Sequence, residues 1–514
     1  MATSPWLRRR LRLAIGGVDV GSSLDLVGGV LKWVGLTFIA PAVVAIGYGE
    51  PPWPFLVAAA VTVAAGLALD AVTRDQAAAA VGVREGFLVV ALTWLVVPAF
   101  GALPFLLGGV PQLSNPFDAY FESVSGFTAS GATVVPDVEA LPRSMLFWRQ
   151  LSHWLGGMGI IVLAVAVLPR LRIGGRHLFE RELAGPTEIE RMSATIRETA
   201  RRLWRLYIGL TALAVVVLAT LGWTGLDPEM SLFDAVAHAF SVLSLGGFSS
   251  KNDSAAGFAP VTQWALMAFM VLAGFNFLRL WVILVQRRGR VVARDEEARL
   301  YLAFLLIGAG LLIVELLAGG FASGEAGVRH AAFQGVAIMT TTGFATADFT
   351  EWGPLAAMTI LLLMFVGASA GSTCGSIKVI RHLMLFKMVR REIEQTVHRD
   401  AVRPVVVSGV VVDDRALRST IVFVLLYLLT FALGAMALTL DARRTGLDLT
   451  AFDAFAASAA CLGNVGPAFG FAGPFGSYEP FGNASTGLLT ILMWLGRVEI
   501  LPAAVLLSRR YWRA

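Results

Sequence analysis

The chain has 514 residues, of which 56% are hydrophobic and only 15% are charged, and its mean hydropathy is +0.71. A soluble protein of this length carries about a quarter charged residues, so the composition excludes an ordinary soluble protein and indicates a polytopic membrane protein. The basic residues that give the net charge of +5 lie between apolar segments, where they indicate membrane topology and not a nucleic-acid-binding surface. The two cysteines, Cys374 and Cys461, exclude a disulfide framework and match no metal-ligand spacing.

Ten apolar segments reach about 20 residues, the length that crosses a bilayer. They lie at residues 27–47, 54–73, 86–108, 146–169, 203–223, 262–286, 299–322, 354–389, 418–440 and 485–508. Four other segments are too short and too polar to span, and we predict re-entrant pore helices at 116–128, 232–244, 328–340 and 451–463. We therefore expect an all-α membrane protein with an N-terminal helix pair in residues 1–80 and four span–pore helix–span repeats. The repeats cover residues 86–170, 203–288, 299–392 and 418–510, and a small strand pair is expected between Val405 and Val412.

The distribution of basic residues predicts the orientation. With the N-terminus inside, arginines concentrate in the predicted inner loops, and an even number of spans puts both termini on the cytoplasmic side. The inner arginines are Arg74, Arg84, Arg170, Arg172, Arg176, Arg181, Arg191, Arg287, Arg288, Arg290, Arg390, Arg391, Arg399, Arg403, Arg509, Arg510 and Arg513. Arg329, Arg443 and Arg444 are exceptions on the predicted outer side.

Four short stretches that end in glycine share one register. They are Thr128–Gly131, Ser244–Gly247, Thr340–Gly343 and Gly463–Gly466. Thirteen positions before the final glycines stand Asp118, Asp234, His330 and Asp453, and three positions earlier stand Asn115, Ser231, Gly327 and Thr450. A Ser, Thr or Asn cap followed by a carboxylate at the third helical position approaches a capping box. Four such units predict internal fourfold pseudo-symmetry around an axis. Gly126 offers a competing register in the first unit, but only Gly131 keeps the spacing to Asp118.

Glycine lets a loop turn its carbonyls inward, and a ring of carbonyls can replace the hydration shell of a potassium-sized ion. A pore helix that ends at such a loop also directs its negative dipole end towards the axis. We therefore predict a cation selectivity filter on the outer side, with potassium bound at Gly131, Gly247, Gly343 and Gly466. The filter residues are Thr128, Ala129, Ser130, Gly131, Leu245, Gly246, Gly247, Thr341, Thr342, Gly343, Asn464, Val465 and Gly466.

The eighth apolar segment is interrupted by Gly367–Ser376, a run of small residues that cannot hold a stable lipid-facing helix. Such a break predicts a hinge or a re-entrant loop that lines a cavity, and a kink for packing is the alternative. The candidate gate residues are Gly367, Gly371, Ser372, Thr373, Gly375, Lys378 and Arg381. Arg497 and Glu499 lie inside the last span, where charges face either a partner or a cavity.

Six motifs together carry a resemblance to a known family. They are Glu122–Gly131, Trp154–Gly159, Gly246–Ser249, Thr340–Phe344, Gly371–Arg381 and Leu495–Ile500. From about residue 25 to its end, the chain resembles the membrane subunit of Trk-type potassium uptake systems, in the superfamily that includes Ktr and plant HKT transporters. The first filter loop departs from the family in having Ala129 where threonine is frequent, and the gate loop is less rich in glycine.

The resemblance implies potassium permeation, since all four filter positions are glycine, and a loop in the third repeat that obstructs conduction beneath the filter. It implies that Arg497 acts as a positive barrier in the pore. It also implies a homodimer in the cell inner membrane, regulated by a cytosolic ring of nucleotide-binding, TrkA-like subunits. Lipid is the other expected partner, and no nucleic acid and no tightly bound cofactor are expected.

The predicted function is thus potassium uptake by channel-like conduction. A proton- or sodium-coupled potassium symporter is the alternative, for which Glu122 and Glu499 are the candidate coupling carboxylates. A receptor or membrane enzyme would need a polar site with a nucleophile or base, and none is visible, so the chain is not expected to be an enzyme. An anion transporter would need helix N-termini at the midplane, which the positions of the caps oppose.

Overall fold

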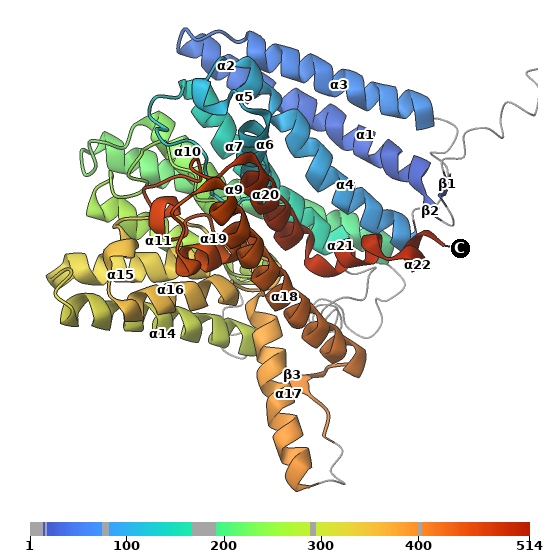
Figure 1. Cartoon of the computed structure of the whole chain (residues 1–514), viewed down its shortest axis with the longest axis vertical. Helices are drawn as coiled ribbons and strands as arrows, with labels where there is room; N and C mark the ends of the chain where they lie inside the picture. The colour runs from blue at the N-terminus through green and yellow to red at the C-terminus, as the bar shows by residue number, and fades with distance from the viewer. Residues whose placement is uncertain are drawn as a thin grey trace, which may run out of the picture.

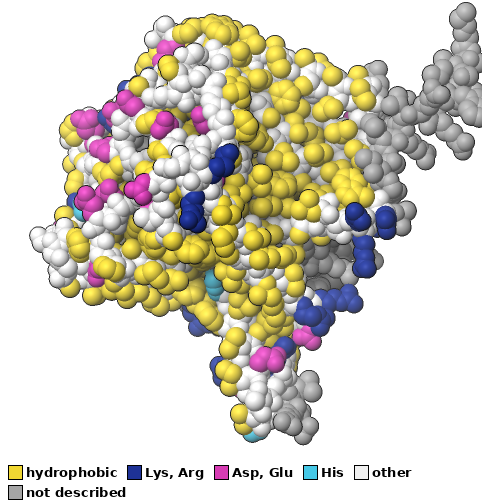
Figure 2. Space-filling model, in the orientation of Figure 1, with side chains coloured by type: hydrophobic (Ala, Val, Ile, Leu, Met, Phe, Trp, Pro, Cys, Tyr) yellow, Lys and Arg dark blue, Asp and Glu magenta, His cyan; other side chains and the backbone are white. Residues whose placement is uncertain are grey.

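The computed structural model describes residues 14–15, 18–73, 82–166, 192–287, 295–398 and 403–513, and within these residues the protein is almost entirely helical. Long helices pack side by side around shorter ones, and helix α17 projects from the helical body with β3 beside it (Figure 1). Hydrophobic side chains cover much of the face in Figure 2, while Lys and Arg gather near its lower right edge. An apolar surface of this extent indicates a protein solvated by lipid.

The N-terminal part contains β1 (Ala14–Ile15), β2 (Val18–Asp19), α1 (Val20–Thr37), α2 (Ile39–Gly47) and α3 (Trp53–Thr73). Small residues let α1 and α3 approach closely, since a β-carbon added to Gly28 would lie 3.0 Å from the Gly66 carbonyl oxygen. An ion pair between Lys32 and Asp70 also joins the two helices. The predicted helix pair in residues 1–80 therefore corresponds, over its described residues, to α1–α2 against α3.

The remaining helices follow the predicted order. They are α4 (Val83–Gly101), α5 (Leu103–Leu107), η1 (Pro111–Leu113), α6 (Pro116–Phe127), α7 (Arg143–Ala166), α9 (Met192–Trp223), α10 (Leu232–Ser244), α11 (Pro260–Ala273), α12 (Phe277–Leu284), α14 (Glu296–Ala318), α15 (Gly324–Met339), η4 (Phe349–Glu351), α16 (Pro354–Val366), α17 (Val379–Val397), α18 (Asp414–Thr445), α19 (Ala451–Gly463), η5 (Gly470–Ala472), α20 (Asn483–Val498), α21 (Ile500–Leu507) and α22 (Arg509–Trp512). The predicted strand pair is present as β3 (Val406–Val407) and β4 (Val410–Val411).

The prediction of ten spans is only partly matched. Among the described residues, six helical segments are long and apolar enough to cross a membrane, and two bent pairs raise the number to eight. The six are Val20–Gly47, Trp53–Thr73, Arg84–Leu107, Glu198–Trp223, Glu296–Ala318 and Asp414–Thr445. The segment predicted at 262–286 is instead α11 and α12, bent by 107°, and the segment at 485–508 is α20 and α21, bent by 108°.

Both bends have a local cause. Asn276 lies between α11 and α12 and caps the N-terminus of α12, because its side chain accepts hydrogen bonds from the amides of Leu278 and Arg279. Glu499, with a φ of +61°, separates α20 from α21. The segment predicted at 354–389 also forms two helices, α16 and α17, with the expected break at the small-residue run between them.

The four short helices α6, α10, α15 and α19 occupy the places predicted for pore helices. Asn115, Ser231 and Thr450 cap three of them, and Thr450 forms a full capping box with Asp453. The fourth predicted cap, Gly327, is wrong: α15 begins at Gly324 after Ser323, whose side chain makes no cap hydrogen bond. The basic stretches at residues 8–12, 74, 170–191, 288–290 and 399 lie outside the described residues, as do the predicted repeat ends at 170 and 288.

Candidate functional site: four glycine loops and the loop beneath them

The four glycine-ended loops share one backbone conformation. Their final glycines have positive φ: Gly131 +82°, Gly247 +80°, Gly343 +79° and Gly466 +103°. The residues two positions earlier are also left-handed: Ala129 +50°, Leu245 +55°, Thr341 +59° and Asn464 +53°. Non-glycine residues rarely adopt this region, least of all a β-branched threonine, and such strain concentrates at functional sites.

The hydrogen bonds of the loops repeat as well. In each loop the amide before the final glycine donates to the carbonyl five residues earlier, at the end of the short helix. The pairs are Ser130 to Ser125 (2.9 Å), Gly246 to Ser241 (2.9 Å), Thr342 to Ala337 (2.8 Å) and Val465 to Ala460 (2.8 Å). Each short helix therefore ends in the same cap and delivers its loop in the same direction.

The loops are arranged head to tail in a closed ring. A β-carbon added to each final glycine would meet the carbonyl oxygen that precedes the final glycine of the next loop. The separations are 2.3 Å from Gly131 to Gly246, 1.9 Å from Gly247 to Thr342, 2.1 Å from Gly343 to Val465 and 2.7 Å from Gly466 to Ser130. Real β-carbons do not approach an oxygen this closely, so only glycine fits at these four positions.

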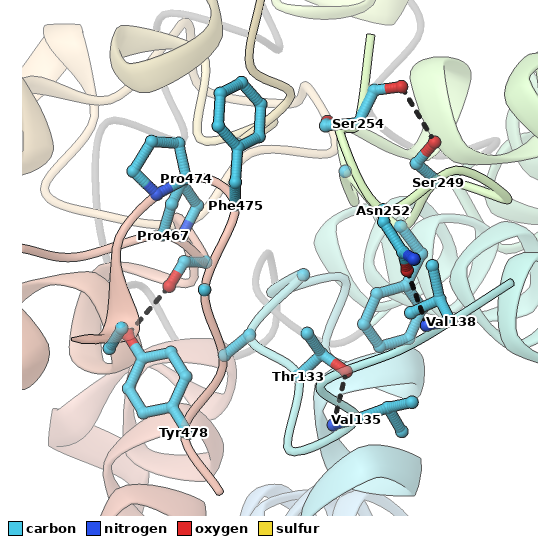
Figure 3. A pocket seen from close by; sticks show the side chains of 18 of the residues that line it. Thr133, Val135, Val138, Ser249, Asn252, Ser254, Pro467, Pro474, Phe475 and Tyr478 are labelled. Atoms are coloured by element: carbon cyan, nitrogen blue, oxygen red, sulfur yellow. Dashed lines mark hydrogen bonds between the residues drawn. The ribbon is translucent and has the colours of Figure 1, made fainter. Parts of the chain in front are cut away.

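All four final glycines line one hollow that is open to solvent, and Figure 3 shows it from close by. Its walls come from the segments that follow the loops, including Thr133, Phe248, Asn252 and Tyr478. The structure thus brings the final glycines of the four predicted filter loops together at this hollow. Gly126 lies inside α6 instead.

A buried ion pair, which the sequence reasoning did not identify, supports two of the loops. The Arg149 Nε atom lies 2.7 Å from Glu122, and both side chains are almost fully buried. Glu122 accepts hydrogen bonds from the Thr133 hydroxyl and the Val134 amide in the first loop. The Arg149 guanidinium lies 4.0 Å from the ring centre of Phe248 in the second loop. An arginine inside the predicted span at 146–169 was the available signal, because intramembrane charges mark partners or cavities.

His153 packs behind the same two loops, one helical turn after Arg149 on α7. Its ring stacks on Phe248 with the ring centres 4.1 Å apart, and Nδ1 lies 3.3 Å from the Ser241 hydroxyl. The side chains of α7 therefore hold the second loop in place from behind. Among the described residues no cluster of His, Cys, Asp and Glu could hold a metal ion.

The outer rim of the hollow carries an acidic residue with a displaced pKa. The Asn252 side-chain amide donates to Asp137 at 2.8 Å, and this hydrogen bond lowers the pKa of the carboxyl group below its ordinary value. The same asparagine accepts from the Val138 amide at 2.7 Å (Figure 3). Asn252 thereby links the outer segment of the second loop to that of the first.

The predicted gate loop lies directly against the glycine loops. The Gly375 amide donates to the Thr341 hydroxyl at 3.0 Å, and the Thr373 hydroxyl donates to the Leu243 carbonyl at 3.3 Å. A β-carbon on Gly375 would lie 2.3 Å from the Gly463 carbonyl. Gly367 and Gly371, with φ of +72° and +77°, allow the chain to enter and turn there.

The gate loop is also attached to the break between α11 and α12. The Ser369 amide donates to Gly274 at 3.1 Å, and Asn276 donates to Ala370 at 2.7 Å. The Ala370 amide in turn donates to the buried Glu297 at 2.6 Å, which pairs with Arg279 at 2.9 Å. Neither Asn276 nor Glu297 was identified from the sequence as a partner of this loop.

Arg497 bridges the gate loop and the first repeat. Its guanidinium donates to the Thr373 carbonyl at 2.8 Å and to the Gly156 carbonyl of α7 at 3.2 Å, and its side chain is buried. It has no carboxylate partner among the described residues. Its guanidinium also lies 5.4 Å from the ring centre of Trp94. A buried cation held by carbonyls and an aromatic ring, with no carboxylate beside it, presents a positive potential to any cation that approaches it.

Glu499 binds the far end of the gate loop rather than Arg497. Its carboxylate lies 3.0 Å from Lys378 and 2.5 Å from Arg381, all three side chains being nearly buried. The Arg381 guanidinium also lies 3.8 Å from the ring centre of Phe423 in α18. Arg497 and Glu499, both in the predicted last span, therefore have different partners: Arg497 binds carbonyls, and Glu499 pairs with Lys378 and Arg381.

A helical membrane protein with four inward-turning glycine loops around one hollow is the class that this geometry defines. Comparisons with known proteins place the chain within that class. A family model described as TrkH, cation transport protein, matches residues 55–513. The chain belongs to this family of cation transport proteins.

Individual relatives agree over nearly the whole length. The chain is 36% identical over 498 residues to the Trk system potassium uptake protein TrkH of Halomonas elongata, covering 95% of this chain and 98% of that one. It is 34% identical over 493 residues to TrkG of Escherichia coli K12, with coverage of 95% and 97%. The crystal structure of the potassium transporter TrkH from Vibrio parahaemolyticus superposes with a TM-score of 0.85 at 31% identity, over 96% of this chain and 100% of that one. All three are named as transport proteins, and this chain is likewise a transport protein and not an enzyme.

Proposed function

We propose that the protein takes up potassium across the cytoplasmic membrane by channel-like conduction, down the electrochemical gradient of the ion. Thirteen residues of the four glycine loops would form the selectivity filter, and the hollow above them would be its outer mouth. The head-to-tail ring of Gly131, Gly247, Gly343 and Gly466, all opening on one hollow, is the observation that carries the proposal. The potassium transport named for the relatives agrees with it.

The direction of the short helices supports a cation as the substrate. Helices α6, α10, α15 and α19 each end at a glycine loop, so their negative dipole ends face the ring and their capped N-termini face away. Main-chain carbonyls replace the water around a potassium ion without a charged side chain. A transporter for small anions would need the opposite helix direction.

The loop from Gly367 to Arg381 would be the gate, and Arg497 the positive barrier beneath the filter. The contacts of this segment with the third and fourth glycine loops, and with Leu243 at the end of α10, support its place in the path of an ion that leaves the ring. Arg497 holds the same segment through Thr373. We propose that activation moves the loop aside and removes both obstacles.

The coupled symporter has less support. Its two candidate carboxylates are both engaged, Glu122 with Arg149 and Glu499 with Lys378 and Arg381. A carboxylate held by a buried cation loses and regains a proton only at a large energetic cost. A reversal potential that follows potassium alone would exclude coupling, whereas one that shifts with the proton or sodium gradient would establish it.

The assembly is proposed on the resemblance and on the basic inner surface. It would be a homodimer of multi-pass subunits in the cell inner membrane, with both termini in the cytoplasm and no tightly bound cofactor. TrkA-like nucleotide-binding subunits would act on the cytoplasmic side, where α17 and the β3–β4 hairpin project (Figure 1).

Potassium and sodium fluxes in proteoliposomes test the proposal. The wild type would be compared with Gly343→Ser, whose side chain would collide with the Val465 carbonyl, and with a deletion of residues 371–376. Potassium-selective flux that the first change degrades and the second increases is the expected result. Absence of cation flux even with a regulatory partner, or flux indifferent to Gly343, would remove the proposed function.

A further inference from the structure

The ring of glycine loops has one junction unlike the other three, where the fourth loop meets the first. The segment after the fourth loop, residues 467–482, is longer than those after the other loops, at 132–142, 248–259 and 344–353. Gly466 also departs from its equivalents in φ, at +103° against +79° to +82°. Both differences involve one residue, Tyr478, which lies in the longer segment and contacts Gly466.

Tyr478 binds both loops at this junction. Its hydroxyl donates to the carbonyl oxygen of Gly466 at 2.8 Å, the hydrogen bond drawn at Tyr478 in Figure 3. Its backbone amide donates to the carbonyl oxygen of Thr133 at 2.8 Å. No side chain among the described residues makes the corresponding bond to the carbonyl of Gly131, Gly247 or Gly343. The fourth glycine is therefore distinguished by a hydroxyl that fixes the direction of its carbonyl.

The tyrosine is itself held firmly. Its side chain is only 2% exposed, and its ring packs against Phe121 of α6 and Phe481, with ring centres 5.7 and 5.9 Å away. Because these neighbours hold the tyrosine ring in place, its hydroxyl cannot follow a carbonyl that moves, and it therefore restrains that carbonyl.

The contact extends into the buried ion pair behind the first loop. Thr133, whose carbonyl Tyr478 binds, has its hydroxyl 3.0 Å from Glu122 and 3.2 Å from Arg149. Arg149 in turn contacts Phe248 of the second loop. A continuous chain of contacts therefore joins the fourth loop to the segments that directly follow the first and second loops. It runs from Phe248 through Arg149, Glu122, Thr133 and Tyr478 to Gly466.

We propose that Tyr478 is a positioning residue that sets ion selectivity at the ring. This inference rests on the proposed function as a potassium filter. A carbonyl ring favours potassium over the smaller sodium ion when its oxygens cannot close in around sodium. The Tyr478 hydroxyl occupies one lone pair of the Gly466 oxygen and leaves the other for the ion. It thereby prevents the Gly466 carbonyl, at the junction between the fourth loop and the first, from moving inward.

The test is the potassium-to-sodium permeability ratio of Tyr478→Phe in proteoliposomes. The change removes the hydroxyl and keeps the ring that packs on Phe121. A hydrogen bond contributes about 0.5–1.5 kcal/mol, so we expect the ratio to fall by about two- to tenfold while potassium still passes. Thr133→Val, which keeps the carbonyl but removes the bonds of the Thr133 hydroxyl to Glu122 and Arg149, should lower the ratio in the same direction.

Tyr511→Phe is the matched control, because that hydroxyl also donates to a backbone carbonyl, Arg84 at 2.7 Å, but far from the ring. It should keep the wild-type ratio, and thermal unfolding should show comparable stability for both phenylalanine variants. A wild-type ratio in both Tyr478→Phe and Thr133→Val, or an equal fall in Tyr511→Phe, would overturn the role of Tyr478 alone. A wild type that does not prefer potassium would overturn the filter itself, so the two failures are distinguishable.

Discussion

The glycine loops and the gate loop lie against each other but are held in place by different means. Each glycine loop takes its shape from its own backbone: two left-handed residues, a bond back to the short helix and a neighbour's carbonyl against a glycine. The gate loop is attached to partners far away in the chain, among them Asn276, Glu297, Arg497 and Glu499. A loop whose shape is set by its own backbone, in four copies, is rigid. A loop that a few side chains hold in place can move when those contacts break. This difference is what a fixed filter above a movable gate requires.

The largest effect on stability should come from releasing the gate loop at its Lys378–Arg381 end. Glu499→Gln leaves Lys378 and Arg381 without their buried carboxylate partner. Breaking such a pair costs on the order of 3 kcal/mol, so the thermal unfolding midpoint in detergent should fall clearly, and resting flux should rise. Glu394→Gln, which breaks exposed pairs with Arg390 and Arg403, should change little. Equal behaviour of the two variants would mean that Glu499 does not hold the loop.

Adding a single methyl group should impair flux at a glycine of the ring but not at a glycine of an ordinary turn. Gly247→Ala adds a β-carbon 1.9 Å from the Thr342 carbonyl at a residue with φ of +80°. Backbone strain alone costs about 1–2 kcal/mol, and the displaced carbonyl should lower potassium flux at least ~tenfold. Gly225→Ala has a similar φ of +74° with no atom within 4 Å of the added carbon, so it should keep its flux. Similar loss in both would show that strain rather than ring contact matters.

Removal of the buried guanidinium should weaken the gate without harming the filter. Arg497→Ala loses the bonds to the Thr373 and Gly156 carbonyls together with the positive charge. We expect resting potassium flux to rise several-fold, because both the barrier and one attachment of the gate loop are gone. The potassium-to-sodium ratio should stay near that of the wild type. Unchanged flux and gating would contradict the assignment of Arg497.

The smallest effect concerns the outer rim and depends on pH. The pKa of Asp137 is lowered in the folded protein by the hydrogen bond from Asn252. Its stabilising contribution is therefore present above the unfolded pKa, near 3.9, and disappears as the pH falls through the lower folded value. Asn252→Ala should flatten the acid end of the stability profile slightly, as followed by thermal unfolding between pH 3 and pH 7. A profile identical to that of the wild type would remove the assigned cause.

The contrast between loops shaped by local contacts and a loop held by distant ones also explains which features the sequence could predict. The glycine loops were predictable because their conformation depends on residues within about fifteen positions, and the register from Asp118 to Gly131 recurs along the chain. The caps at Asn115, Ser231 and Thr450 were predictable for the same local reason, and the Gly327 cap failed where no side chain was available. The bends at Asn276 and Glu499 were missed because both segments are apolar enough to continue as helices, so the apolar pattern conceals the cap at Asn276 and the positive φ of Glu499.

The partners of the buried charges were beyond reach for another reason. Glu122 and Arg149 are 27 residues apart, and Glu499 and Arg381 are 118 residues apart. No spacing rule relates such residues, and several arginines could have faced each carboxylate. Tyr478 gives no sequence signal either, since it lies in an outer segment that has no counterpart of equal length in the other repeats.

The central claim is that four equivalent glycines form one ring around the ion. The most direct test replaces Gly131, Gly247, Gly343 and Gly466 with serine, one at a time, and measures the potassium-to-sodium permeability ratio of each variant in proteoliposomes. The account predicts that all four substitutions lower the ratio, because each side chain meets the carbonyl of the next loop. A wild-type ratio in any one of the four, in a protein that remains folded and conducts, would contradict a closed ring of four loops.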